Sequence, residues 1–291
     1  PKNGYCDFAS KPVEIVIRNN GCTPLSSLPV RYQVNGGTAV TETATFSPAL
    51  GLGDTITYSF TTPLAFATPG IYNITAFSAL VGDADNENDT ARGDDLEYTT
   101  PITSFPFIED FESATVGGQV LGNTNWRFDD GLDPNFKWQV GVEMTDERNT
   151  GPFRGYHYKG KYLYTQSNNT SGGLSTFLRT LCLDLSTMGA SHNATLDFYY
   201  HMFGSNIDKL QVQVSLGNEP VDQWTTISVI NGNGQQNSEM ADWKLHRVDL
   251  SSYAGSIKLR FKAVRKGTGA KTNMAIDKIM VDDRAANDGG G

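Results

Sequence analysis

Three acidic residues in the longer, C-terminal part of the sequence have the chemistry of a calcium site. Asp110 and Glu112 are two positions apart, so a β-strand would place both on one side and Phe111 toward the core. Asp277 lies in a terminal strand-like segment, which in jelly rolls often runs near the first strand. Ca²⁺ takes about six to eight oxygen ligands. We expect a structural Ca²⁺ at these three carboxylates with Asp146 as a further ligand; ordinary surface carboxylates are the alternative.

Two other acidic runs are weaker metal candidates. Residues 83–89 place carboxylates at every second position, as an EF-hand loop does. However, Asn88 stands where that loop needs glycine, and Asp94 stands where it needs glutamate. Residues 129–133 also carry acidic side chains beside a glycine. Both runs read as solvated turns, and metal binding by either stays open.

The residues that usually perform catalysis are scattered. There is no His-Glu-x-x-His motif, no Gly-x-Ser-x-Gly elbow and no phosphate-binding glycine loop. The lack of a Cys-x-x-Cys pair also excludes a common kind of zinc site. A Ser-His-Asp triad can be assembled from distant residues, so sequence alone does not disprove one. We expect a protein that is not an enzyme. The histidines are His157, His192, His201 and His246.

Tryptophan side chains offer a possible sugar-binding platform, because a flat ring can stack on a pyranose face. Trp126 and Trp138 flank the acidic turn at residues 129–133 and are the candidates for partial exposure. Packing in the core or at a sheet edge is the alternative for both, as it is for Trp224 and Trp243.

The composition excludes several classes of partner. The 291 residues carry 23 basic and 32 acidic side chains, a net charge of −9. A chain without a basic stripe is poorly suited to nucleic acid or to anionic lipid. No apolar run approaches the roughly 20 residues of a membrane span, so we expect no membrane insertion. The opening residues and the linker-like tail at 284–291 suggest a segment of a longer multidomain chain.

The three cysteines suggest one disulfide bond. Cys6 and Cys22 flank a strand-like run and would close a 15-residue loop, which the chain-entropy model values at about 3 kcal/mol. Two unpaired thiols are the alternative. Cys182 is then left over, in an apolar run, and reads as a small buried hydrophobic residue.

The elements around these residues are expected to be strands. In residues 1–99, apolar side chains recur at every second place over 13–18, 30–34 and 55–60, and Asn35-Gly-Gly37 predicts a hairpin turn. About seven strands at this spacing indicate an immunoglobulin-like sandwich. Residues 100–106, with two prolines and no periodicity, read as a linker.

Residues 107–283 continue the same alternation in a larger second domain. The clearest strands are 194–202, 209–216 and 257–263. In the last of these, Lys258, Arg260 and Lys262 alternate with apolar residues and are expected on a solvated face. Helices are minor, so the fold class is all-β: an immunoglobulin-like sandwich followed by a jelly roll.

The order of short motifs in the second domain resembles the MAM family of extracellular adhesion and receptor modules. The motifs lie at residues 110–112, 151–152, His157, 182–185, 198–204, 242–243 and 275–277. Related jelly rolls often carry a structural Ca²⁺ at the first and last of these. Two positions depart from the pattern: Tyr156 replaces an acidic residue, and Lys278 replaces a second Asp. The missing cysteine framework favours a bacterial adhesin-type branch.

The first domain resembles the CARDB-like modules of bacterial surface proteins, which are spacers or adhesion units. Two short motifs also resemble the O-glycosylation acceptor of secreted Bacteroidetes proteins and make Thr55 and Thr90 candidate sites of a glycoprotein. Five Asn-x-Ser/Thr matches would be coincidental in a bacterial protein.

Together these features predict a non-catalytic adhesion or binding segment of a secreted or cell-surface bacterial protein. Its partner would be an extracellular glycan or protein, which the sequence does not name. The alternative is the carbohydrate-binding accessory region of a secreted hydrolase, either a glycosidase or a peptidase; a glycan array distinguishes the two.

Overall fold

The structure is a computed structural model that divides into two compact units, Pro1–Thr100 and Pro101–Gly291. Within the described residues the only helices are two short 3₁₀ turns, η1 (Tyr156–Tyr158) and η2 (Leu185–Met188), which confirms the all-β prediction. The structure describes residues 3–6, 10–68, 70–83, 85–93, 95–98, 100–117, 126–128, 135–167, 175–180, 182–217, 223–232 and 234–284.

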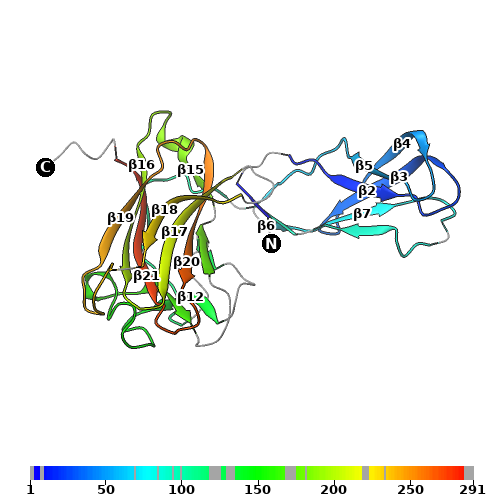
Figure 1. The fold of residues 1–291 in the computed structure, drawn as a ribbon. Coiled ribbons are helices and arrows are strands. Elements are labelled where there is room, and N and C mark those ends of the chain that lie inside the picture. Colours follow the sequence, from blue (N-terminus) through cyan, green and yellow to red (C-terminus); the bar gives the residue numbers. More distant parts are fainter. Residues whose placement is uncertain are drawn as a thin grey trace. The chain divides into compact units, whose positions relative to one another are not determined.

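The first unit is a small sandwich of short sheets (Figure 1). One sheet has the order β4-β3-β7-β8, a second pairs β2 with β5, and a third has the order β1-β9-β6. The strands are β1 (Asn3–Tyr5), β2 (Glu14–Arg18), β3 (Leu25–Val34), β4 (Val40–Leu50), β5 (Thr55–Ser59), β6 (Gly70–Tyr72), β7 (Ile74–Ser78), β8 (Thr90–Arg92) and β9 (Leu96–Tyr98).

The sequence pattern explains the longest strand of this unit. Leu28, Val30 and Tyr32 alternate along β3 and are all buried, as period two requires. The predicted hairpin between β3 and β4 is confirmed, because Asn35 and Gly36 adopt φ values of 49° and 69°.

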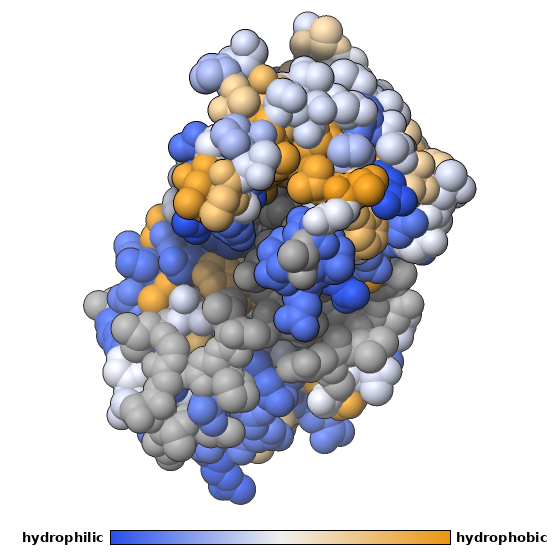
Figure 2. All heavy atoms as spheres, turned by 90° about the vertical axis from the view of Figure 1, so that its right-hand side faces the viewer, coloured by the Kyte–Doolittle hydropathy of each residue, from blue (hydrophilic) through white to orange (hydrophobic). Residues whose placement is uncertain are grey.

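Figure 2 faces the first unit and shows hydrophobic side chains in patches among hydrophilic ones.

The second unit is a jelly-roll sandwich of two antiparallel sheets. One has the order β12-β13-β21-β16-β19, with β10 also paired to β21; the other has the order β11-β14-β20-β17-β18, with β15 also paired to β20. The strands are β10 (Phe107–Glu109), β11 (Trp126–Phe128), β12 (Phe136–Gly141), β13 (Tyr162–Ser167), β14 (Ser175–Thr180), β15 (Leu183–Asp184), β16 (Ala194–Met202), β17 (Ile207–Leu216), β18 (Thr225–Asn231), β19 (Lys244–Asp249), β20 (Ser256–Arg265) and β21 (Met274–Asp283).

The first and last strands of this unit are neighbours, as expected for a jelly roll. β10 runs antiparallel to β21, with Phe107 opposite Val281 and Glu109 opposite Ile279. This pairing brings residues 110–112 close to Asp277. Residues 101–106, expected in a linker, belong to the second unit, where Ile102 forms a backbone bridge to Leu183.

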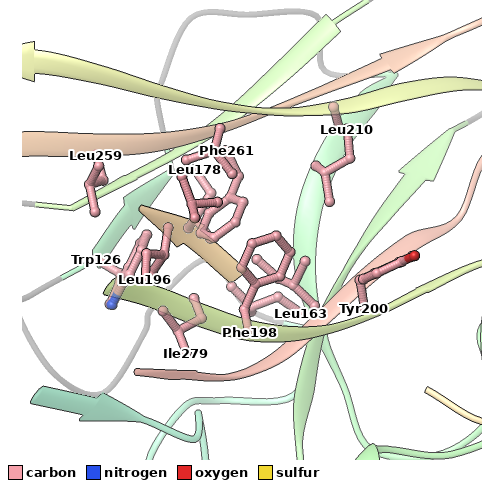
Figure 3. Close-up of a cluster of buried hydrophobic side chains, with 14 of the residues drawn as sticks. Trp126, Leu163, Leu178, Leu196, Phe198, Tyr200, Leu210, Leu259, Phe261 and Ile279 are labelled. Atoms are coloured by element: carbon pink, nitrogen blue, oxygen red, sulfur yellow. The ribbon is translucent and has the colours of Figure 1, made fainter. Parts of the chain in front are cut away.

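A single apolar core fills the space between the two sheets of the jelly roll. Figure 3 shows side chains from both sheets converging on it, with Phe198 of β16 and Phe261 of β20 meeting edge to face at a centroid distance of 4.8 Å. Trp126 of β11 lies in the same core, 5.7 Å from the Phe261 ring. Alternating apolar residues on both sheets thus make a continuous buried layer.

The charges along β20 do not form the expected solvated face. β20 lies between β14 and β17, so it is a central strand, and Lys258 is only 1% exposed. Arg260 lies 4.3 Å above the rings of both Phe177 and Trp224. The prediction was wrong because alternation shows which residues share a face but not whether that face is covered.

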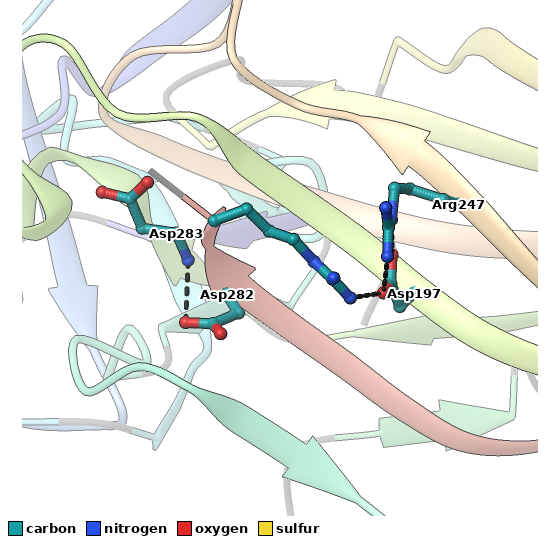
Figure 4. A network of polar contacts seen from close by, with 5 residues as sticks. Asp197, Arg247, Asp282 and Asp283 are labelled. Atoms are coloured by element: carbon teal, nitrogen blue, oxygen red, sulfur yellow. Dashed lines mark hydrogen bonds and ion pairs between the residues drawn. The ribbon is translucent and has the colours of Figure 1, made fainter. Parts of the chain in front are cut away.

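A buried carboxylate crosslinks three neighbouring strands of the other sheet, β21, β16 and β19. Asp197 of β16 receives two hydrogen bonds from Arg247 of β19, at 2.9 and 3.1 Å, and pairs with Arg284 just beyond β21 (Figure 4). Both arginines reach toward solvent while the carboxylate is covered. The contacts lie toward the C-terminal end of β21, where Asp197 is opposite Met280 and Tyr199 is opposite Asp277.

Candidate functional site

The segment that carries Asp110 and Glu112 is a turn and not a continued strand. β10 ends at Glu109, and Phe111 adopts the left-handed region with φ 58°. Phe111 is buried in the core and Asp110 and Glu112 are exposed, as predicted, although the expected strand does not continue through them. The backbone N–H of Glu112 donates to Asp110 Oδ1 at 3.2 Å, which closes the turn.

Glu109 is a buried carboxylate that the sequence analysis did not select. It is 4% exposed, and its Oε1 accepts a hydrogen bond of 2.9 Å from the backbone of Phe111. Its burial could have been predicted from the sequence. Alternate residues of a strand face the same side, and Glu109 alternates with the apolar Phe107 and Phe111. The carboxylate supports the turn from its inner side.

Asp277 is the most perturbed acidic residue near this turn. It is 5% exposed, and its two oxygens accept backbone hydrogen bonds from Tyr156 at 3.0 Å and Lys278 at 2.7 Å. Burial raises the pKa of Asp277 to about 7, against the two hydrogen bonds, and the charges of Glu112 and Asp110 raise it further. The three predicted carboxylates therefore lie close enough to affect one another's charge.

Residues 155–161 connect Asp277 to Glu112. At one end Tyr156 donates to Asp277, and at the other Lys161 N donates to Glu112 Oε1 at 2.8 Å. Gly160, with φ 80°, permits this approach, because a Cβ there would lie 2.2 Å from Glu112 Oε1. We call the turn at 110–112, Asp277 and residues 155–161 the carboxylate end.

Asp146 has its hydrogen-bond partners on β13. Its Oδ2 accepts from Gln166 Nε2 at 2.8 Å and from the Tyr164 hydroxyl at 3.4 Å. Over the described ranges, no group of three or more His, Cys, Asp or Glu side chains is placed ready to hold a metal ion. Ca²⁺ at Asp110, Glu112, Asp277 and Asp146 thus stays a prediction, and it requires the exposed carboxylates to turn on binding.

A pocket of about 310 Å³ adjoins the carboxylate end. It is formed by three segments far apart in the sequence, and we call it the aromatic pocket. Its lining comprises residues 153–158, Tyr199 and residues 239–243.

Tyr156 belongs to both the carboxylate end and the aromatic pocket. Its ring stacks on Tyr199 of β16 with a centroid distance of 3.6 Å and an interplanar angle of 23°. Burial, a hydrogen bond to Tyr199 and the nearby Asp277 raise the pKa of Tyr156 to about 12, so the phenol is neutral at physiological pH. The stacking and the backbone bond to Asp277 fix this wall of the pocket.

The outer wall of the pocket is more exposed. Tyr158 is 59% exposed, and its hydroxyl donates to Asp242 Oδ1 at 3.1 Å. Trp243 is partly buried, and its Nε1 donates to the Arg154 carbonyl at 3.1 Å. The sequence placed His157 in a family motif and read Trp243 as packing, but no local pattern shows that these segments meet.

The predicted tryptophan platform is wrong. Trp126 is 2% exposed and Trp138 is 1% exposed, and both belong to the jelly-roll core. Neither ring can stack on a sugar. The neighbouring acidic turn suggested exposure, but residues 129–133 lie outside the described residues.

The predicted disulfide bond is also wrong. Cys22 is a free thiol in an exposed bend, whereas Cys6 and Cys182 are both disulfide-bonded. Cys182 is therefore not the unpaired hydrophobic residue that was expected. A 15-residue loop is long enough for a disulfide bond to close it. However, the spacing does not show whether the Cα–Cβ bonds of the two cysteines point toward each other.

The remaining sequence candidates are surface features of the first unit. Asp83 and Asp85 in the turn at 83–89 accept hydrogen bonds from backbone N–H groups two residues ahead, as solvated turn residues do. Thr55 and Thr90 are exposed and accessible to a modifying enzyme, so their glycosylation stays a prediction.

The described part of the chain has no helix long and apolar enough to span a membrane.

One serine–histidine contact has the residue types of a catalytic pair. Ser228 Oγ lies 2.7 Å from His246 Nε2, and burial lowers the pKa of His246. Within the described residues, no carboxylate hydrogen bond to the His246 ring is found to orient it. The pair joins β18 of one sheet to β19 of the other, which is a structural arrangement.

Comparison with known proteins places the second unit in a recognised group. The model of the MAM domain (meprin/A5/mu) matches residues 110–285. Neuropilin-1a of Danio rerio is 27% identical over an alignment of 236 residues, and the match covers 77% of this chain but only 23% of that relative. The chain thus spans about a quarter of that protein's length. The match to the MAM model does not extend into residues 1–109.

Two solved structures show weak similarity. The K1 cleaved adhesin domain of Lys-gingipain from Porphyromonas gingivalis has a TM-score of 0.40 and 15% identity, covering 62% of this chain and 99% of that one. The CBM22-1 xylan-binding domain from Paenibacillus barcinonensis Xyn10C has a TM-score of 0.36 and 15% identity, covering 61% and 92%.

Proposed function

The chain belongs to the MAM family, and from this premise we propose that it is a non-catalytic adhesion or binding segment of a secreted or cell-surface bacterial protein. The domain type is that of a binding module. The first unit, for which we keep the proposal of a CARDB-like spacer, would present the jelly roll to an extracellular glycan or protein.

The aromatic pocket is the observation that carries the proposal. It is a preformed recess of about 310 Å³ with aromatic walls and charged side chains at its rim, the usual character of a recognition site. The disulfide-bonded Cys6 and Cys182 support an oxidising, extracellular location.

We also propose that a structural Ca²⁺ joins Asp110, Glu112 and Asp277. Asp277 is held by two backbone N–H groups, while Asp110 and Glu112 are exposed and would exchange the backbone hydrogen bonds that they accept for the ion. A divalent cation would relieve the repulsion that the other two carboxylates exert on Asp277. Asp146, a loop residue that accepts hydrogen bonds from Gln166 and Tyr164 of β13, is a further candidate oxygen ligand.

The second candidate function is the carbohydrate-binding accessory region of a secreted hydrolase. The aromatic pocket favours it, because the pocket supplies the exposed aromatic surface that Trp126 and Trp138 do not. The two functions differ in what the flanking regions of the gene encode, since an accessory region requires a hydrolase domain on the same chain.

Binding and turnover assays test the main proposal. We expect beads coated with the purified chain to adhere to cells or extracellular matrix, whereas beads coated with heat-unfolded chain do not. The same chain should hydrolyse no peptide, ester or glycoside substrate. Turnover that a single substitution such as Ser228→Ala or His246→Ala abolishes would contradict the proposal.

A further inference from the structure

We propose that the aromatic pocket binds a neutral pyranose ring of an extracellular glycan. This inference rests on the proposed binding function and specifies the chemical class of its partner. The proposed sugar-binding residues differ from the buried Trp126 and Trp138. They line the aromatic pocket and are Tyr158, Trp243, Arg154, Glu239 and Asp242.

The aromatic surface is the first requirement for a sugar site. Tyr158 exposes more than half of its surface at the pocket, and its hydroxyl is held by Asp242 at 3.1 Å. The Trp243 ring is fixed by its bond to the Arg154 carbonyl and by an edge contact with Tyr162 at 5.7 Å. Rings held in this way offer a flat apolar surface at little cost in conformational entropy.

The polar groups are the second requirement. Sugar hydroxyls both donate and accept hydrogen bonds, so their site needs groups of both kinds. Glu239 and Asp242 are acceptors, and each has one oxygen with no protein partner in the described part of the chain. The Arg154 side chain is exposed, lies 5.3 Å from the Phe153 ring and makes no ion pair within that part, so it supplies donors.

The charge balance favours a neutral ligand. Arg154 offsets one of the two carboxylates, so the charged lining sums to about −1. An ammonium ligand would gain from the tyrosine rings but could not use Arg154, which would repel it. An anionic sugar would meet Glu239 and Asp242. A neutral ring can use every one of these groups.

The size and stiffness of the pocket agree with this ligand class. A volume of 310 Å³ lies at the lower end of the range for small-molecule sites, about 300–1,000 Å³. His157 and Tyr158 are consecutive non-glycine residues with φ near 60°, a conformation that costs energy and is retained where surrounding contacts require it. The Tyr156–Tyr199 stack behind them supplies such contacts.

An array of saccharides tests the inference on the full chain. The neutral probes are immobilised gluco-, galacto-, manno- and xylo-oligosaccharides. The competing probes are heparin and sialyllactose, which are anionic, and choline and arginine methyl ester, which are cationic. We expect binding to at least one neutral probe, followed by titration calorimetry to obtain its Kd.

Variants then locate the binding. Tyr158→Ala removes the exposed ring, and we expect at least about tenfold weaker binding, which corresponds to about 1.4 kcal/mol. Tyr158→Phe keeps the ring and should bind more tightly than Tyr158→Ala. Arg154→Gln should weaken binding without changing the Tm. The control is Val229→Ala, an exposed apolar residue on β18 away from the pocket, which should bind as the original chain does.

Three results would overturn the inference: no neutral probe bound, neutral binding that survives both Tyr158→Ala and Arg154→Gln, or binding confined to the charged probes. Bead adhesion measured on the same preparations separates this failure from that of the proposed function. A chain that adheres without binding a neutral saccharide retains the proposed function, whereas a chain that does neither loses both.

Discussion

At the scale of single residues, Asp277 and His201 are two buried groups whose charged forms the fold disfavours. Burial raises the pKa of Asp277 to about 7 and lowers the pKa of His201 to about 4. Their effects on stability have opposite signs. Asp277 binds a proton more readily in the folded state, and His201 binds one more readily in the unfolded state.

His201 makes the stability of the jelly roll depend on pH. Its contribution is fully present above its ordinary pKa of 6.5 and is lost as the pH falls toward 4. A shift of this size corresponds to at most about 3 kcal/mol. We expect the unfolding free energy of the original chain to fall more steeply between pH 6.5 and 4 than that of His201→Gln, measured by urea denaturation.

The comparison of slopes separates His201 from the other titrating groups. Asp277 is present in both proteins, so its opposite effect cancels in the difference. The absolute stability of His201→Gln is not the readout, because a fully buried side chain has been replaced. Parallel pH profiles for the two proteins would contradict the prediction.

At the scale of elements, residues 155–161 hold together the two features that make up the candidate site. Tyr156 contributes its backbone N–H to Asp277 and its ring to the aromatic pocket. Lys161 fixes Glu112 through its backbone, and its Nζ donates to two carbonyls of the 110–114 segment. A change within this segment should therefore weaken the hydrogen bonds that Asp277 and Glu112 accept from it.

Gly160→Ala tests that connection against a matched glycine. Gly160 and Gly255 have φ values of 80° and 76°, but a Cβ at Gly255 meets nothing within 4 Å. Both substitutions incur the left-handed backbone cost of about 1–2 kcal/mol. We expect Gly160→Ala to lower the unfolding free energy by about 1 kcal/mol more, because it displaces Glu112 from Lys161 N. Equal losses in denaturant titrations would show that Glu112 is not held there.

The sequence was sufficient for most elements and for some of the site. Period-two alternation located β3, β16 and β17. The same alternation predicted that Phe111, between Asp110 and Glu112, is buried in the core. It did not show that β20 would be central and Lys258 covered, because coverage depends on strand order. The aromatic pocket could not be predicted, since residues 153–158, Tyr199 and 239–243 meet only through the tertiary fold.

At the scale of the whole molecule, the chain consists of two β-units, and its three cysteines are in two different covalent states. Cys22 of the first unit is an exposed free thiol, while Cys6 and Cys182 are disulfide-bonded. Cys6 is disulfide-bonded as predicted, but Cys22 and Cys182 exchange the roles that the sequence spacing suggested. This assignment also provides a test of the structure that needs no ligand.

Thiol labelling of the native chain under non-reducing conditions should modify Cys22 alone. We expect peptide mapping to find the label on Cys22 and no label on the Cys22→Ser variant. Reduction after unfolding should make Cys6 and Cys182 reactive as well. A native chain with no reactive thiol, or one labelled at Cys182, would contradict the assignment.

Thermal unfolding in calcium and in chelator tests most directly whether the jelly roll is a calcium-stabilised binding module. At free Ca²⁺ of about 100 times the Kd, one bound ion stabilises the native state by about 2.7 kcal/mol. We predict that chelator lowers the Tm of the second unit and leaves that of the first unchanged. Glu112→Gln and Asp277→Asn should each abolish the difference. A second unit whose Tm responds to neither chelator nor these substitutions would contradict the account.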